Sequence, residues 1–370
     1  MSSFILSCLL SSAALAAEPT PQSVEPIPFA PLEGSAPAAV APHDGTAALA
    51  GAEALAQPID YDLAGSSLIQ SAQAAAAIGA ATVAGNVQAD APERVEDDYD
   101  AGTFFRQAKS IPWRLGGAAA AITLTGLANW DWGSSKFHFE REGWFGKDTA
   151  SLGMDKLGHA YSAYVLAEFF TDGINKSYPG RRSTSYTGAL LSMGLMTYIE
   201  VFDGFSKDHG FSHEDLIVDA AGALFSVARR TVPGLREKLD FRLLYTPDRR
   251  TLRALGCLPE PHCDREGETV RSPITDYSNQ RYLLALKLAG FDRLADTPLR
   301  FVELHTGYYA RGFTAEEESR GDPLRRRIFF GAGLNVGELL FPGRPRGGVG
   351  RALKSVLEYL QLPYTAVHSN

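Results

Sequence analysis

The chain contains little that would identify a common class of protein. It has three cysteines in 370 residues, and its longest uncharged apolar segments are Leu115–Trp130 and Ser183–Ile199. Both fall short of the roughly 20 residues that a membrane-spanning helix needs, so they are expected to be core helices or to lie at a membrane surface. The sequence also lacks a Walker loop, a zinc-finger spacing, a dinucleotide fingerprint and a G-x-S-x-G elbow.

Charge is unevenly distributed along the chain. The whole sequence has a net charge of -8, but residues 18–100 contain thirteen acids and one base, which leaves residues 101–370 at +4. So small a basic surplus over this length is not the footprint of a nucleic-acid-binding protein. We therefore expect no nucleic-acid partner.

The N-terminal segment has the form of a secretory signal peptide. Residues 1–17 combine an apolar stretch with small residues, and Ala14–Ala16 fits an A-x-A cleavage site. A lipoprotein cysteine at Cys8 and an uncleaved anchor are the alternatives. The following segment, residues 18–100, is rich in alanine, proline and acids, and is predicted to be a disordered linker because it offers too little apolar surface to fold.

Two cysteines remain after the predicted cleavage. Cys257 and Cys263 bound the short segment CLPEPHC, and export to an oxidising compartment favours a disulfide between them. Free thiols are one alternative. A metal site that also uses His262 is the other, although three ligands within seven residues make a weak zinc signature.

Hydrophobic periodicity divides the remaining chain into an α part and a β part. Residues 101–235 are predicted to form a bundle of about four helices, at Trp113–Asn129, Asp155–Ile174, Ser183–Phe205 and Ser212–Arg230. Glycines within three of these helices suggest close packing.

Residues 236–341 switch to the alternating pattern of strands, expected at Phe241–Tyr245, Tyr282–Leu288, Phe301–Phe313 and Arg327–Leu340. Residues 342–370 are predicted to contain an amphipathic helix, Gly350–Leu362. The fold class is therefore α+β, with a helical bundle, a small antiparallel sheet and a C-terminal helix. The alternative is a sheet that several chains build together.

Ionisable residues recur at helical spacing at one end of three predicted helices. Asp155 and His159 are four residues apart, and so are Asp215 and Asp219, which places each pair on one helix face. Glu200 and Asp203 are three apart on the third helix. Packed together, these ends would converge. Two neighbours, Lys156 and Ser162, are expected to support the cluster.

Several carboxylates and an imidazole in one confined space cannot all stay ionised without compensation. A divalent metal would supply that compensation, because bundles commonly hold metals with such ligands. The candidate ligands are Asp155, His159, Glu200 and Asp215, with Asp203 or Asp219 as a base or outer partner. The alternative is a structural network, since Ser212–Asp215 has the form of a capping box and Asp155 suits a helix N-terminus.

The same residues resemble the YfiM-like family of predicted periplasmic lipoproteins, over roughly residues 101–365. The blocks that carry the resemblance are Glu142–Gly146, Gly153–His159, Tyr198–Glu200, Asp203–Phe205 and Gly210–Ser212 with Asp215 and Gly222. Asp219 departs from the family pattern, in which asparagine is expected. The order of the acids and the histidine is also similar to that of VanZ-like membrane proteins. The resemblance implies a location in the cell envelope rather than an activity.

These observations predict a periplasmic protein that is associated with the outer membrane and whose biochemistry is unknown. The leading interpretation is that it has no catalytic activity. Its partner would be a membrane surface or an outer-membrane component, or a second copy of the chain. One alternative is a metal-dependent hydrolase that acts on an envelope lipid or phosphoester. The other is a lipid- or peptide-binding module that uses a stripe containing Met193 and Met196.

Overall fold

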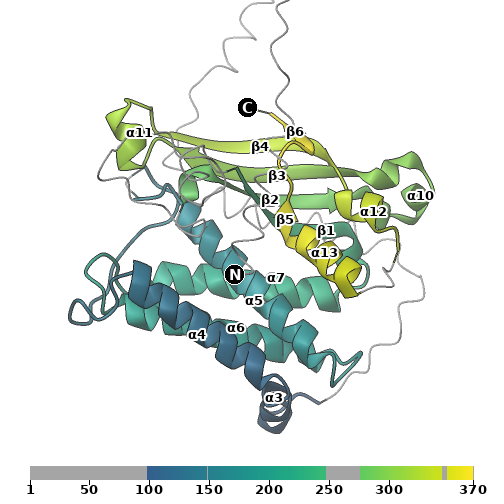
Figure 1. Cartoon of the computed structure of the whole chain (residues 1–370), viewed down its shortest axis with the longest axis horizontal. Helices are drawn as coiled ribbons and strands as arrows, with labels where there is room; N and C mark the ends of the chain where they lie inside the picture. Colours follow the sequence, from purple (N-terminus) through teal and green to yellow (C-terminus); the bar gives the residue numbers. More distant parts are fainter. Residues whose placement is uncertain (1–97, 148, 247–275, 344–347, 370) are drawn as a thin grey trace, which may run out of the picture.

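The structure, a computed structural model, describes residues 98–147, 149–246, 276–343 and 348–369. The predicted signal peptide, nearly all of the linker and the Cys257–Cys263 pair lie outside these residues, so those interpretations stay predictions. The described part contains both helices and a curled sheet, as the α+β prediction requires (Figure 1).

Five helices form the bundle, and four of them match the predicted helices to within two residues at each end. They are α3 (Ala101–Ala108), α4 (Pro112–Asn129), α5 (Met154–Ile174), α6 (Ser183–Asp203) and α7 (His213–Thr231). The sequence analysis missed α3, which begins where the Asp100 side chain accepts a hydrogen bond from the Thr103 amide. Among the described helices, none is long and apolar enough to cross a membrane.

Glycines allow the central helices to approach one another closely. A Cβ atom on Gly222 of α7 would overlap the carbonyl group of Ala160 on α5, and one on Gly188 of α6 would lie 2.8 Å from the Ala167 oxygen. The three helices therefore pack backbone against backbone at these points. The predicted close packing of the glycine-containing helices is confirmed there.

The sheet contains six strands in the order β5-β1-β2-β3-β4-β6. Their bounds are β1 (Leu239–Tyr245), β2 (Gln280–Lys287), β3 (Val302–Arg311), β4 (Arg325–Leu334), β5 (Leu360–Gln361) and β6 (Ala366–His368). The pairing of β1 with β5 is parallel and the other pairings are antiparallel. The sheet is therefore mixed, and the prediction of a purely antiparallel sheet was wrong. Since β5 and β6 occupy opposite edges but only residues 362–365 separate them, the sheet has to curl.

Short elements complete the fold and correct two predicted boundaries. The expected strand to Leu340 ends at Leu334, because the Asn335 side chain accepts a hydrogen bond from the Glu338 amide and starts a helix. The expected C-terminal helix ends at Tyr359 and continues as β5. The short helices are α8 (Leu235–Lys238), α10 (Asp292–Ala295), α11 (Ala315–Ser319), α12 (Val336–Leu340) and α13 (Gly348–Tyr359), and the 3-10 turns are η3 (Tyr277–Asn279), η4 (Leu288–Gly290) and η5 (Pro298–Phe301).

Aromatic side chains join the bundle to the sheet. Tyr161 of α5 stacks against Phe241 of β1 and Tyr282 of β2, with ring centroids 5.5 and 5.6 Å apart. The Tyr308 hydroxyl of β3 donates a hydrogen bond to the Leu152 carbonyl just before α5. The start of α5 is therefore held directly against the sheet.

We predict opposite effects for alanine at two glycines. Gly222→Ala should lower the free energy of unfolding by several kcal/mol, because its Cβ has no room between α5 and α7. Gly194→Ala should raise it by about 0.5–1 kcal/mol, because that glycine sits in α6 with open space around it. Urea unfolding of both variants checks this. Equal effects at the two positions would contradict the close approach of α5 and α7.

Candidate metal centre

The predicted cluster assembles at one end of the bundle. Asp155 and His159 lie near the beginning of α5, Glu200 near the end of α6, and Asp215 and Asp219 near the beginning of α7. The Ser212 side chain caps α7 by accepting a hydrogen bond from the Asp215 amide, which is one half of the expected capping box. The other half does not form, because the Ser212 amide donates to Glu200 and the Asp215 carboxylate pairs with Lys156. Antiparallel packing of α5 against α6 and of α6 against α7 brings these helix ends together.

One half of the cluster is built around Lys156, which is 2% exposed. Its ammonium lies 2.8 Å from Asp215 Oδ2 and 3.1 Å from Asp155 Oδ2, and it also contacts Glu142. Asp155 Oδ1 accepts a further hydrogen bond of 2.8 Å from the Tyr277 hydroxyl. Lys156 therefore compensates carboxylates from three segments of the chain.

The charges in this half shift its pKa values strongly. Burial lowers the pKa of Lys156. The negative charges of Asp155, Asp215 and Glu142 outweigh this effect and raise the pKa well above its ordinary value. Although burial raises the pKa of Asp155, the charges of His159 and Lys156 hold it well below its usual range. Burial and the neighbouring charges of Asp155 and Asp215 raise the pKa of Glu142 to about 8.

The other half is built around His159. Its Nδ1 lies 3.4 Å from Asp219 Oδ1 and 3.6 Å from Glu200 Oε1. Glu200 also accepts a hydrogen bond of 3.0 Å from the Ser212 amide. Asp219 is fully buried, yet neither of its carboxylate oxygens makes a hydrogen bond, and His159 Nδ1 makes none either. Buried polar atoms without a partner are rare and costly.

Burial also sets the protonation of this half. It raises the pKa of Glu200 to about 9, and it raises the pKa of Asp219 from its ordinary value. Burial lowers the pKa of His159, but the neighbouring carboxylates of Asp155 and Asp219 raise it well above its usual value. The carboxyl groups of Glu200 and Asp219 and the imidazole of His159 therefore compete for protons in one small volume. A bound cation would replace those protons.

Two sets of possible ligand atoms share His159. They are Asp155, His159 and Asp215, and His159, Glu200 and Asp219, with the atoms of each set within 4.8 Å of one another. Ligands about 2.1 Å from a tetrahedral metal lie about 3.4 Å from each other, close to the two distances at His159 Nδ1. The two distances from His159 in the second set match this spacing. In the first set, Asp155 and Asp215 are already paired with Lys156.

The remaining predicted site residues lie outside both sets. Asp203 instead accepts a hydrogen bond of 2.6 Å from the Trp132 indole, and Ser162 is exposed on α5. Asp219 lies within the second ligand set, whereas the sequence analysis gave it an accessory role. Glu142 and Tyr277 were not identified as cluster residues, because their segments are distant in sequence from the helices that carry the acids.

The sequence analysis also missed a second ionic network, at the opposite end of the bundle. It is centred on Arg229 and Arg230, which are both buried, although consecutive arginines usually lie at a solvent-exposed surface. Arg229 pairs with Glu168 of α5 at 3.3 Å, with Asp240 of β1 at 2.5 Å and with Glu358 of α13 at 3.1 Å. Arg230 pairs with the same Glu168 at 2.7 Å.

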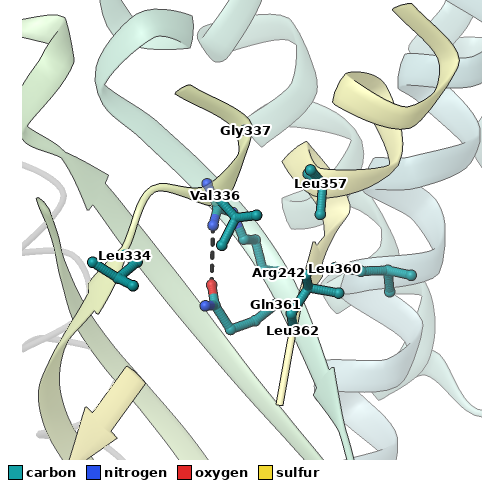
Figure 2. A pocket seen from close by; sticks show the side chains of 8 residues that line it. All are labelled: Arg242, Leu334, Val336, Gly337, Leu357, Leu360, Gln361 and Leu362. Carbon is teal, nitrogen blue, oxygen red and sulfur yellow. Dashed lines mark hydrogen bonds between the residues drawn. The ribbon is translucent and has the colours of Figure 1, made fainter. Parts of the chain in front are cut away.

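The network extends into the curled sheet. Arg242 of β1 contacts Asp240 at 2.7 Å, Glu303 at 2.8 Å and the Gln361 side chain at 3.0 Å. Figure 2 shows the last of these bonds within a pocket between β1, β5 and α12. This pocket encloses no space for a water-sized sphere and lies apart from the His159 cluster. It therefore offers no room for a ligand.

Comparison with known proteins supports the predicted location for the segment that carries the cluster. A family model described as a predicted periplasmic lipoprotein (DUF2279) matches residues 141–231. The match begins one residue before Glu142 and ends one residue after Arg230, so it spans the helix positions of both ionic groups. No curated protein and no solved structure matches the chain.

We predict that Arg229→Met lowers the free energy of unfolding by about 3–5 kcal/mol at neutral pH, because it leaves Glu168 and Asp240 buried with one cation fewer. Burial raises the pKa of Asp240, but the charges of Lys287, Arg229 and Arg242 hold it well below its usual range. Burial also raises the pKa of Glu168, but Arg230 and Arg229 lower it below its ordinary value. This stabilisation is therefore complete above the unfolded pKa values near 4 and is lost as the pH falls further.

Urea unfolding at several pH values checks this prediction, and the wild-type advantage over Arg229→Met should shrink below about pH 4. Asp322→Asn is the matched control, because it removes one partner of the exposed Arg320–Asp322 pair. It should change stability by less than about 1 kcal/mol. A similar small loss for Arg229→Met would show that the buried network does not hold the bundle to the sheet.

Proposed function

We propose that this chain is an exported cell-envelope protein whose helical bundle holds one divalent metal ion between His159, Glu200 and Asp219. Asp219 is the observation that carries the proposal. Neither oxygen of this fully buried carboxylate makes a hydrogen bond, and its ion-pair partner among the described residues is His159, whose Nδ1 lies 3.4 Å from Oδ1. A cation at this position would satisfy Asp219, Glu200 and His159 Nδ1 together.

The ligand chemistry favours a first-row divalent metal. One imidazole nitrogen and two carboxylate oxygens suit Zn²⁺ and related ions. Each ligand comes from a different helix, α5, α6 or α7, so the ion would join three helix ends. Lys156 compensates Asp155 and Asp215 beside it, which leaves these two carboxylates as outer partners of the ion in this proposal.

The role that we propose for the ion is structural. We favour this role because the three ligands come from three different helices, so that the ion would join their ends. Hydrolysis of a lipid or phosphoester would in addition need a substrate cleft beside the cluster. A binding groove along Met193 and Met196 is not supported, because Met196 is 2% exposed and packs against Trp132. The family description supports the periplasm, and association with the outer membrane is a further part of the proposal.

The first test is elemental analysis of the purified protein. We expect about one divalent metal ion per wild-type chain, and at least tenfold less in Glu200→Gln and Asp219→Asn, which keep side-chain volume but remove a charged ligand. Removing the metal with a chelator should also lower the thermal stability of the wild type. Adding it back at about 100 times its dissociation constant should restore about 2.7 kcal/mol.

Two variants serve as controls. His213→Ala removes an exposed imidazole at the start of α7, and Asp203→Asn changes the carboxylate that contacts Trp132. Both should retain the metal. A wild type that contains no metal and is unaffected by added Zn²⁺ or by chelator would contradict the proposal and identify the cluster as a purely hydrogen-bonded network.

A further inference from the structure

The polarity of α7 is opposite to that of a helix on the surface of a water-soluble protein. Its charged residues after His213 are all buried, whereas its exposed positions are apolar. The buried ones are Glu214, Asp215, Asp219, Arg229 and Arg230, and the exposed ones are Ile217, Ala221 and Leu224. An ordinary amphipathic helix places its polar side toward water and its apolar stripe toward the core.

The same reversal is present in α6. The exposed positions of this helix are Tyr186, Leu190, Gly194, Val201 and Phe202, and none is charged. Its interior side carries polar residues instead, including Thr187, Ser192 and Glu200, each at most 1% exposed. The helix therefore directs hydrogen-bonding groups inward and apolar groups outward along its whole length.

Helix α4 shows the outward apolar side most clearly. Trp113 is 91% exposed, Leu124 is 69% exposed and Leu127 is 62% exposed. Its one charged side chain, Arg114, does not face outward but stacks on Phe169 and donates to the Phe169 carbonyl. Helix α6 contacts both α4 and α7, so the three helices that carry these exposed apolar positions are neighbours. We call this surface the apolar outer face, defined by Trp113, Leu124, Leu127, Tyr186, Leu190, Ile217 and Leu224.

An apolar face of this kind suits a partner that excludes water and needs no hydrogen bonds from the protein. Contiguous exposed apolar surface marks an interaction site, but a protein partner normally forms about one hydrogen bond per 100–200 Å² of interface. The outer face offers almost no donors or acceptors for that purpose. Lipid acyl chains require none, and inward-facing, mutually paired charges are the arrangement found in proteins embedded in lipid.

The border of the face has the chemistry of a membrane interface. At the end where α4 begins, Lys109 is exposed four residues before Trp113, and Lys176 is exposed on the turn after α5, whose Gly173 lies against Arg114. Tryptophan prefers the headgroup level of a bilayer, and lysines there attract anionic headgroups. The acids of the candidate metal centre are largely buried at the other end of the bundle, so they do not oppose this attraction.

We propose that the apolar outer face of α4, α6 and α7 rests in the headgroup and acyl-chain boundary of a lipid bilayer that contains anionic lipids. In this proposal the bundle lies on the bilayer surface, and none of the described helices is long and apolar enough to cross a membrane. A face of this kind enters the bilayer by about 5–10 Å. This inference does not depend on the metal.

The test is flotation of the full chain with vesicles of phosphatidylethanolamine and phosphatidylglycerol. We expect the wild type to float with the vesicles, and a variant with Leu124→Glu, Leu190→Glu and Leu224→Glu to bind at least about tenfold more weakly. The three leucines point outward, so the variant should keep its helical content, which circular dichroism checks. Phe330→Glu, at an exposed position of β4, is the matched control and should bind as the wild type does.

Trp113 gives a second, local measurement. Lipids with brominated acyl chains should quench the fluorescence of the wild type more than that of Trp113→Phe. The comparison detects contact at the outer face even if residues 1–97 also bind vesicles. Equal quenching of the two proteins, or equal flotation of the wild type and the triple variant, would overturn the proposal. So would a wild type that ignores vesicles but forms a dimer that the triple variant loses, because the face would then join two copies.

Discussion

The structure depends on the compensation of charge inside a helical bundle. A buried ionised group without a partner costs several kcal/mol, so each charge between α5, α6 and α7 has to be balanced where it lies. Lys156 balances the carboxylates of Asp155 and Asp215 at one end, and Arg229 balances Glu168 and Asp240 at the other. Asp219 is balanced only by His159 at 3.4 Å, and this imbalance is why we propose a cation there.

The same constraint explains why polarity is reversed across the bundle. Because the charged residues of α6 and α7 face inward to meet one another, the positions left on the outside are apolar. Gly222 and Gly188 allow the helices to come close enough for the inward charges to pair. The polar interior, the close helix contacts and the apolar outer face are therefore three consequences of one arrangement.

Sequence alone predicted the elements whose signals are local. The periods of α4 to α7, the Ser212 cap and the convergence of Asp155, His159, Glu200 and Asp215 all follow from helical spacing and from helix ends. Other features depend on contacts between distant segments. Arg229 is buried because Asp240 and Glu358 approach from the sheet and from α13, and β5 pairs with β1 across more than a hundred residues. Nothing in the local pattern of an Arg-Arg pair or of Leu360–Gln361 signals either contact.

A metal ion between His159, Glu200 and Asp219 would resolve the imbalance of charge in the cluster. The most direct measurement is a crystal structure of the protein with zinc, with diffraction data collected above and below the absorption edge of the metal. We expect an anomalous peak about 2.0–2.2 Å from His159 Nδ1 and from one oxygen each of Glu200 and Asp219. An ordered cluster with no peak there, and a hydrogen bond from protonated Glu200 or His159 to Asp219 instead, would contradict it.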